Sequence, residues 1–346
     1  MRSINMLKSD EFRFSVIGLE HNHVNGQTNG LLQAGAVLVN VYDEDPEKVK
    51  NYIEKFPQVK AVLSEEEILR DPAIQMIVSV VRPDKRASMG LRIMRAGKHC
   101  FSDKPGMLAL DEVAEVRATC AETGKKFFIN FAEHIQVESA IYAGKLIREG
   151  AIGRVIHVTM LAPHRLIPDR RPAWFWDPKQ AGGILADIGS HQFENFLTYT
   201  SAKTASITSS RLCNYNNPAH PGFFDFGDCS LVADNGATGY FRIDWFTPDG
   251  LCTWGDCRSF IVGTEGTIEI RKYLEVGISP EGDHVYLVNK TGEHRIEAKG
   301  KTGLPFFADM IQDCINRTDT AMTQDHIFES MRLALEAQEK AKIINI

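Results

Sequence analysis

Three residues in two separate stretches of this 346-residue chain have the chemical types needed to transfer a proton. Lys104 stands near the end of AGKHCFSDKP (residues 96–105), where we expect a strand to end and where open α/β sheets bind their ligands. Asp187 and His191 are four residues apart in GGILADIGSHQFEN, a spacing that places both on one face of a helix. A lysine, a histidine and an orienting carboxylate can move a proton on and off a hydroxyl group beside a hydride carrier.

A second candidate is the stretch VIGLEHNHVNG (residues 16–26), which follows a short apolar segment. Gly18 fits the first glycine of the G-x-G-x-x-G loop that binds a pyrophosphate, but Glu20 and His23 occupy the second and third positions. His21 and His23 could ligate zinc or iron, yet a site needs a third protein ligand, and none stands nearby in a recognisable spacing. We therefore expect no metal, and histidines that hydrogen-bond to cofactor, substrate or backbone.

Asp43 supports the dinucleotide interpretation of this region. It follows the second expected strand, 25 residues after Gly18, where an acid binds the hydroxyl groups of the adenosine ribose. An acid there disfavours a 2′-phosphate, so NAD is expected in preference to NADP. The alternative is that Asp43 only opens the turn before the next helix.

The elements that must position these residues alternate in the first third of the chain. Short apolar runs are separated by stretches with helical spacing, and this rhythm predicts a parallel sheet with helices on both faces, a doubly wound arrangement. One helix is expected over residues 26–35, ending at Gly35, and the last strand of the domain over 125–132.

From about residue 154 the pattern changes to period-two alternation with glycine-bearing turns, which predicts antiparallel strands with one polar face. A helix over residues 185–200 interrupts them, and two more helices, the last over 325–344, close the chain. We therefore expect a dinucleotide-binding domain over residues 1–130 and an α+β domain over 131–346, whose C-terminal helix packs back on the first domain.

Composition excludes several classes of protein. The chain is 43% hydrophobic and 24% charged with a net charge of −6, which argues against nucleic acid or a membrane surface as partner. No apolar run approaches the length that a bilayer needs, and no signal peptide is evident, so a cytoplasmic protein is expected. Seven cysteines without a C-x-x-C pair are expected to be reduced thiols.

The chain resembles the glucose–fructose oxidoreductase / inositol dehydrogenase / MocA (Gfo/Idh/MocA) family over nearly its full length. AGKHCFSDKP corresponds to the family's A-G-K-H-V-x-x-E-K-P, and GGILADIGSH to its G-G-G-x-x-x-D-x-G-x-H. LIREGAIGRV and FIVGTEGTIEI match further family stretches in the same order. The resemblance implies a Rossmann domain followed by an open-faced, mainly antiparallel sheet with helices, used for substrate binding and oligomerisation. It also implies NAD(P)-dependent chemistry at a secondary hydroxyl of a sugar, cyclitol or derivative.

Carried over by the motifs, Lys104 is the lysine that contacts substrate and nicotinamide, Asp187 the motif aspartate and His191 the usual proton acceptor or donor. The resemblance also implies a cis peptide between Lys104 and Pro105. Asp103 replaces the usual glutamate and shortens the reach to the cofactor ribose. Arg82-Pro83-Asp84 replaces the usual Thr-Pro-Asn and puts a cation and an anion near the cofactor. The histidine-bearing loop is the largest departure, although a subset of the family carries a similar G-L-D-H-x-H loop. The expected cofactor-binding residues are Gly18, Glu20, His21, His23, Asp43, Arg82, Pro83, Asp103 and Lys104.

Substrate contacts are expected from the stretch APHRLIPDRRPAWFWDP and from Glu133 and His134 in NFAEHIQ. Tryptophan faces stack on sugar rings, and arginines suit carboxylates or phosphates; the alternative is a basic loop packed by two core tryptophans. The candidates are His134, Arg165, Trp174 and Trp176, together with Lys104, Asp187 and His191.

Three functions fit the sequence. The first is a sugar or cyclitol dehydrogenase that forms a homo-oligomer, a dimer or a tetramer. The second is an NAD-dependent glycosidase or lyase that oxidises a sugar carbon transiently, and the third is a non-enzymatic sugar or nucleotide sensor. Net accumulation of NADH during turnover separates the first from the second. The substrate and the direction of the reaction are not readable from the sequence.

Overall fold

The computed structural model describes residues 11–345, and contacts between its residues divide the chain into two compact units. The first unit consists of residues 11–130 and 304–328, and the second of residues 131–303 and 329–345. Among residues 11–345, none of the helices combines the length and the apolar character that a membrane crossing requires.

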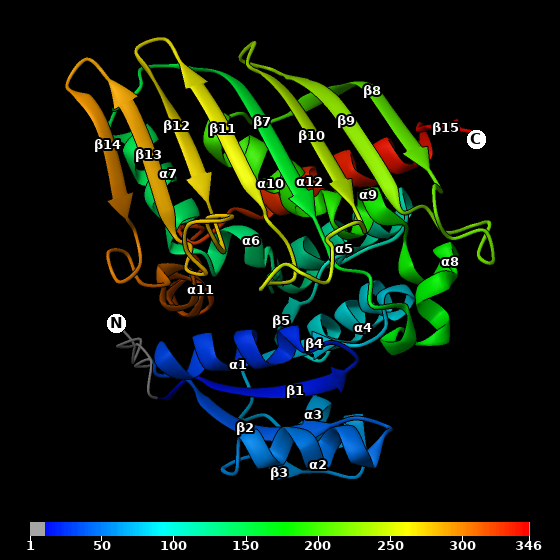
Figure 1. Cartoon of the computed structure of the whole chain (residues 1–346). Coiled ribbons are helices and arrows are strands. Elements are labelled where there is room, and N and C mark those ends of the chain that lie inside the picture. Colours follow the sequence, from blue (N-terminus) through cyan, green and yellow to red (C-terminus); the bar gives the residue numbers. More distant parts are fainter. Residues whose placement is uncertain (1–10, 346) are drawn as a thin grey trace, which may run out of the picture. The chain divides into compact units, whose positions relative to one another are not determined.

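The first unit is built on a six-stranded sheet in which every neighbouring pair is parallel. The strand order is β3-β2-β1-β4-β5-β6 (Figure 1), so the chain moves outward from β1 to β3 and then returns to the other side of β1. This is the doubly wound arrangement that the alternation of strand and helix predicts, and the prediction is confirmed. The strands are β1 (Arg13–Leu19), β2 (Val37–Tyr42), β3 (Lys60–Ala61), β4 (Met76–Val80), β5 (His99–Ser102) and β6 (Phe127–Ile129).

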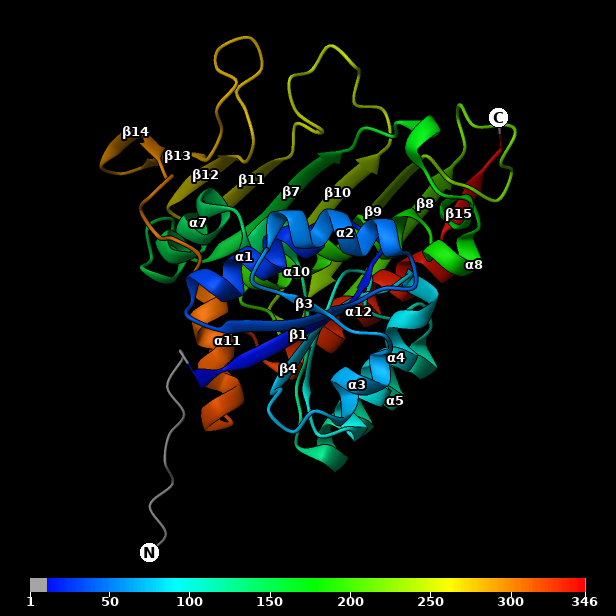
Figure 2. The same cartoon turned by 90° about the horizontal axis from the view of Figure 1, so that it is seen from below.

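The helices of the first unit cover both faces of this sheet. Because strand–helix–strand crossovers are right-handed, the reversal at β1 places the helices of the two halves on opposite faces. Thus α1 packs against β2 and β4 on one face, whereas α4 packs against β4, β5 and α5 on the other (Figure 2). The helices are α1 (His23–Gln33), α2 (Pro46–Lys55), α3 (Glu65–Arg70), α4 (Pro83–Arg95), α5 (Leu110–Thr123), α11 (Pro305–Asn316) and the first part of α12 (Gln324–Glu339).

The second unit contains a nine-stranded sheet with the order β14-β13-β12-β11-β7-β10-β9-β8-β15. Most neighbours are antiparallel, as predicted, but β7 pairs parallel with β10 and β15 pairs parallel with β8. The strands are β7 (Val155–Pro163), β8 (Ala205–Cys213), β9 (Phe226–Ala233), β10 (Thr238–Asp244), β11 (Arg258–Gly263), β12 (Gly266–Arg271), β13 (His284–Asn289), β14 (Gly292–Glu297) and β15 (Lys342–Ile344).

Helices cover one face of this sheet, and its core lies beneath them. α7 packs on β12 and β13, α9 on β9 and β10, and α10 on β7 and β10 (Figure 1). Phe193 and Phe196 of α10 are fully buried and belong to the same cluster as Phe241 of β10, whose ring meets Phe193 edge-on at 4.9 Å. The helices are α6 (Ala132–Ile135), α7 (Glu138–Arg148), α8 (Pro178–Ala181), α9 (Ile184–Asp187), α10 (Gly189–Thr200), and the short 3₁₀ turns η2 (Pro168–Arg170) and η3 (Ala173–Trp176).

The structure corrects several element predictions. α1 begins at His23, three residues before the expected start, because the loop turns directly into the helix after Asn22. The expected helix over residues 325–344 ends at Glu339, and residues 342–344 pair with β8 as an edge strand. The expected single helix over residues 185–200 is two consecutive helices, α9 and α10, divided at Ile188. β3 and α3 have no counterpart among the predicted elements.

Candidate functional site

The end of β1, which contains Gly18, and the loop after it have the backbone of a tight turn although they carry a single glycine. Gly18 has φ +85°, and a Cβ atom there would come within 2.6–2.8 Å of Val81. The N–H of Glu20 then donates to the carbonyl of Val80, which ties the loop to the end of β4. Only glycine fits this position without strain, so the first glycine of the dinucleotide-type turn is retained for a physical reason.

Glu20 forms an ion pair with a lysine of α2. Its Oε1 atom lies 2.9 Å from Nζ of Lys48, and both side chains are about one-third exposed. The carboxylate is thereby neutralised by a lysine of α2.

Asp43 directly follows β2 and binds backbone groups of two loops. Its Oδ2 accepts the N–H of Leu19 at 2.6 Å, and its Oδ1 accepts the N–H of Asp45 at 2.8 Å. A carboxylate has about four lone-pair positions, so these two bonds leave capacity for ribose hydroxyls. Asp43 therefore joins the ends of β1 and β2 and also opens the turn that leads to α2.

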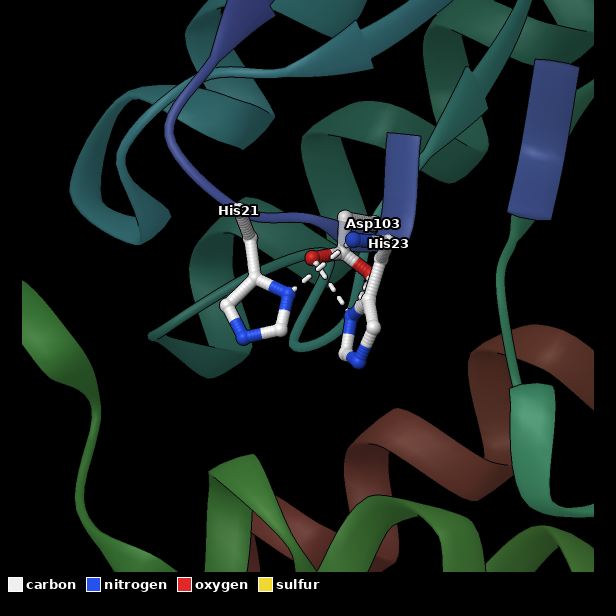
Figure 3. Close-up of side chains that lie close together, drawn as sticks. All are labelled: His21, His23 and Asp103. Carbon is white, nitrogen blue, oxygen red and sulfur yellow. Dashed lines mark hydrogen bonds and ion pairs between the residues drawn. The ribbon is translucent and has the colours of Figure 1, made fainter. Parts of the chain in front are cut away.

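His23, at the first residue of α1, meets Asp103, which follows β5 (Figure 3). Nδ1 of His23 lies 3.0 Å and 3.1 Å from the two carboxylate oxygens, and Nη2 of Arg86 lies 3.3 Å from Oδ2. Burial opposes ionisation of Asp103, but the charges of His23 and Arg86 and the bond from His23 hold its pKa well below the usual value. His21 is next to this pair, with its ring centroid 3.8 Å from that of His23.

Lys104 and Pro105 follow this aspartate, and the peptide bond between them is cis, as the resemblance implies. The buried guanidinium of Arg86 donates to the carbonyls of Lys104, Pro105 and Val81. A single arginine of α4 thus binds the carbonyls of the two residues that form the cis peptide bond, together with that of Val81. Lys104 itself is 8% exposed.

The remaining cofactor candidates, Arg82 and Pro83, mark the start of α4. Pro83 is the first residue of the helix, a position where the missing N–H of proline costs no hydrogen bond. Arg82 donates from Nε and Nη2 to the two oxygens of Asp84 at 2.6 Å and 2.9 Å. The cation and the anion expected near the cofactor are therefore paired with each other.

In the second unit, Asp187 ends α9 and His191 lies in the first turn of α10. The hydroxyl of Ser190 donates to the carbonyl of Asp187 at 2.9 Å, and the amide of Asn195 donates to the carbonyl of His191 at 2.6 Å. His191 is 3% exposed, and its ring meets that of Phe131 edge-on at 6.2 Å. Local side-chain bonds thus stabilise the junction between the two helices.

Asp187 has a fixed cation near it. Burial lowers the pKa of Arg171, and the charge of Asp187 opposes this effect. The guanidinium of Arg171 lies over the rings of Phe175 and Trp245 at 4.5 Å and 4.9 Å, and Nε donates to the carbonyl of Leu166 at 2.6 Å. Asp187 also lines a small pocket with Phe175 and Trp245.

The substrate candidates of the long loop have structural partners within the second unit. Arg165 donates from Nη2 to the carbonyls of Pro248 and Leu251 at 2.9 Å and 2.6 Å, so its guanidinium holds a neighbouring loop. Trp176 stacks on His220 with a centroid separation of 4.0 Å and an angle of 12°. Trp174 packs partly buried against the core of the unit.

His134 is similarly engaged. Its Nδ1 lies 2.8 Å from Oε1 of Glu194, a fully buried carboxylate that also accepts the hydroxyl of Thr198 at 2.8 Å. Glu194 is in the second turn of α10. His134 therefore links α6 to the helix that carries His191.

A buried polar cluster is centred on Glu133, one of the two residues of NFAEHIQ that the sequence offers as substrate contacts. Its Oε2 atom lies 3.0 Å from Nζ of Lys272 and accepts the amide of Gln192 at 3.1 Å, whereas Oε1 lies 3.8 Å from Nε2 of His164. Burial raises the pKa of Glu133, but the electrostatic effects of Lys272, His191 and His164 lower it by more than burial raises it. The resulting pKa is about 2. The cluster thus contains an ionised carboxylate that is hydrogen-bonded to Gln192, the residue after His191.

The structure brings the cofactor candidates together at the carboxyl ends of β1, β2, β4 and β5 within the first unit, and it brings Asp187, His191 and His134 together around α9 and α10 within the second. It adds Arg86 and Lys272, which were not among the predicted site residues. A charged residue on the apolar face of a helix was the available signal for Arg86. No comparable signal marked Lys272, because its pairing with Glu133 spans 139 residues.

Comparison with known proteins agrees with this architecture. Residues 12–131 match the family described as an oxidoreductase family with an NAD-binding Rossmann fold, and residues 141–269 match the GFO/IDH/MocA C-terminal domain. A protein of known structure from Erwinia carotovora atroseptica is 45% identical, with 96% of this chain and 100% of that chain covered and a TM-score of 0.93.

Two curated relatives match over shorter stretches. scyllo-Inositol 2-dehydrogenase (NAD(+)) of Bacillus subtilis is 27% identical over 205 residues, which are 59% of this chain and 57% of the relative. scyllo-Inositol 2-dehydrogenase (NADP(+)) IolW of the same organism is 23% identical over 186 residues, 53% of this chain and 51% of the relative. The chain thus spans somewhat more than half the length of these curated relatives. On the two matched domains and the near-complete structural match, the chain belongs to the Gfo/Idh/MocA family of NAD-binding oxidoreductases.

Proposed function

We propose that this protein is an NAD(P)-dependent dehydrogenase that acts on a secondary hydroxyl of a sugar, a cyclitol or a related compound. The observation that carries the proposal is Lys104, the second residue after β5, at the carboxyl edge of a doubly wound sheet belonging to an NAD-binding family. Relatives that carry this family's domains include dehydrogenases of scyllo-inositol. Ligands of open α/β sheets bind at this edge, beside the strand where the order reverses.

The cofactor is proposed to bind through the Gly18 turn, with Asp43 on the adenosine ribose and Asp103 near the nicotinamide ribose. Glu20, His21, His23, Arg82 and Pro83 line the same edge. NAD is preferred because the Asp43 carboxylate would repel a 2′-phosphate at short range. The bond from the Leu19 N–H supports this assignment, since it holds the carboxylate at the end of β1.

The proton chemistry is assigned to three residues. His191 exchanges the proton of the substrate hydroxyl, since an imidazole titrates near neutral pH. Lys104 supplies a cation that polarises the same oxygen, and Asp187 orients the pair. The bound dinucleotide would accept or supply the hydride. His134, Arg165, Trp174 and Trp176 are proposed as substrate contacts, with Trp174 and Trp176 providing faces of the kind on which sugar rings stack.

A substrate screen tests the proposal. Purified protein is incubated with NAD⁺ or NADP⁺ and a panel of cyclitols, aldoses and anhydro sugars, and the absorbance of the reduced nicotinamide is followed. We expect net formation of NADH with at least one polyol. Product formation without accumulation of NADH would favour a glycosidase or lyase, and failure to bind either dinucleotide would refute the proposal.

Site variants then test the assignment of roles on the substrate found. Loss of a positioned general base lowers rates by a factor of about 10²–10⁴, so His191→Ala should reduce kcat by that factor while NADH binding is retained. His157→Ala is a matched control, because His157 lies on β7 and bonds to the hydroxyls of Thr159 and Thr238. Normal kcat in His191→Ala would contradict the assignment.

A further inference from the structure

Three side chains with metal-binding atoms converge beside the loop after β1. His21, His23 and Asp103 each place one nitrogen or oxygen atom within 4.8 Å of the corresponding atoms of the other two. Figure 3 shows the two imidazole rings next to each other on the same side of the Asp103 carboxylate. The H-x-H pair therefore has a third partner that lies 80 residues away in the sequence.

The fold explains why this partner is where it is. Asp103 directly follows β5, and the histidines follow β1 after a short turn, with β4 between the two strands. The carboxyl ends of parallel strands meet at one edge of the sheet, so residues distant in sequence become neighbours there. His21 precedes α1 and His23 begins it, which lets two residues at a spacing of two present their rings to one point.

Two imidazoles and one carboxylate are a recognised ligand set for borderline divalent ions. They bind Zn²⁺ in sites that keep a coordination position open, and they bind Fe²⁺ in the two-histidine, one-carboxylate arrangement. We propose that His21, His23 and Asp103 form a binding site for one divalent transition-metal ion, represented by Zn²⁺, that keeps at least one coordination position open.

The distances are compatible with this site. With metal–ligand bonds of about 2.1 Å, neighbouring ligand atoms around a tetrahedral ion are about 3.4 Å apart. The separation of 3.0 Å between Nδ1 of His23 and Oδ1 of Asp103 is slightly shorter than this ligand–ligand distance. The ligand atoms of the three side chains all lie within 4.8 Å of one another, which exceeds the same distance by little more than 1 Å. Side-chain rotation of the partly exposed histidines is sufficient to make up the difference.

Neighbouring groups hold the ligands in the way that metal sites usually require. Nη2 of Arg86 lies 3.3 Å from Oδ2 of Asp103, and the same guanidinium donates to the carbonyls of Val81, Lys104 and Pro105. The N–H of His23 donates to Nδ1 of His21 at 3.2 Å, which orients that ring. Such hydrogen bonds to the metal-binding side chains fix their orientation and tune their affinity for the ion.

The inference goes beyond the proposed dehydrogenase activity and is independent of it, because it concerns binding of an ion to the protein alone. It also accounts for the unusual loop. In a glycine-rich loop, backbone N–H groups provide the positive field for a pyrophosphate. Here an ion held by the histidines would provide positive charge at the same edge, and its open position could accept an anionic oxygen.

Equilibrium dialysis with Co²⁺ and with Zn²⁺ tests the site on the untagged full chain, after treatment with a chelator. We expect one ion per chain at micromolar free metal, and cobalt absorption bands of a nitrogen- and oxygen-ligated ion without thiolate charge transfer. His21→Ala, His23→Ala and Asp103→Asn should each weaken binding at least 100-fold. His21→Ala is the decisive variant, because the His21 side chain is partly exposed and lies just before α1. Thermal unfolding checks that this variant folds.

Controls separate this site from other ligands of the chain. His157→Ala and the exposed Cys252→Ser should bind the metal like the unmodified protein. Glu133, His164 and Cys257 form another group with metal-binding atoms within 4.8 Å, so His164→Ala and Cys257→Ser are examined as well. The proposal is overturned if no stoichiometric binding occurs, if binding survives the His21, His23 and Asp103 substitutions, or if it is lost only with His164 or Cys257.

Discussion

Removal of the Glu133 carboxylate should destabilise the second unit strongly at neutral pH. In Glu133→Gln the ammonium of Lys272, whose side chain is 1% exposed, loses its partner at 3.0 Å. Breaking a buried ion pair by removal of one member costs about 3–5 kcal/mol. The pKa of Glu133 gives a comparable value. Each pKa unit corresponds to about 1.4 kcal/mol, so the fall of the pKa from 4.5 to about 2 corresponds to about 3 kcal/mol.

The pH dependence follows from the direction of this shift. The pKa of Glu133 is lower in the folded state than in the unfolded state, so its contribution is complete well above pH 4.5 and is lost as the pH falls towards 2. The difference in unfolding free energy between the unmodified protein and Glu133→Gln should therefore be constant from pH 8 to pH 6. It should be smaller by about 1 kcal/mol at pH 3.5 than at pH 7.

Urea unfolding followed by tryptophan fluorescence measures this difference selectively. All four tryptophans, Trp174, Trp176, Trp245 and Trp254, lie in the second unit, so their emission reports on the unit that contains Glu133. This choice matters because a chain of two units need not unfold in a single step.

Two further variants make the result specific. Glu149→Gln is the matched control, because Glu149 pairs with Lys145 at 3.8 Å with both side chains more than half exposed, and such pairs contribute less than about 1 kcal/mol. Glu133→Leu combined with Lys272→Met should recover most of the lost stability, because no buried charge remains. If Glu133→Gln is as stable as the control, or if the difference does not shrink in acid, the buried ion pair is not the cause.

Three other predictions concern the proposed activity and assembly. Fluorescence titration should show tighter binding of NADH than of NADPH, and Asp43→Ala should reduce that preference; tighter NADPH binding would contradict the ribose assignment. Lys104→Ala and His191→Ala should each lower kcat on the true substrate. If Lys104→Ala abolished turnover while His191→Ala did not affect it, Lys104 would be the base. The face of the nine-stranded sheet opposite α7, α9 and α10 carries no helix within residues 131–303, and we expect it to join copies of the chain in a dimer or tetramer (Figure 1). Sedimentation of a monomer at micromolar concentration would exclude this assembly.

Much of the fold was predictable because it depends on local periodicity. β4 is an unbroken apolar run and is buried throughout, as a central parallel strand must be. The motif around Lys104 specified the end of β5, and the spacing of Asp187 and His191 specified their common helical region. Short or edge elements escaped prediction: residues 342–344 continue a helical pattern in sequence, but pairing with β8 makes them a strand.

The sequence by itself determined the doubly wound unit, the mainly antiparallel sheet, the position of the first glycine turn and the identities of Lys104, Asp187 and His191, because each depends on residues close together in the chain. Only the tertiary structure decided which distant charges meet. It placed Asp103 against His23 and His21, Arg86 around the carbonyls of Lys104 and Pro105, and Lys272 against Glu133. The physical reason is that an ionisable side chain is buried only where a partner of opposite charge or a hydrogen bond compensates for lost water, and that partner is brought by folding from another strand or helix.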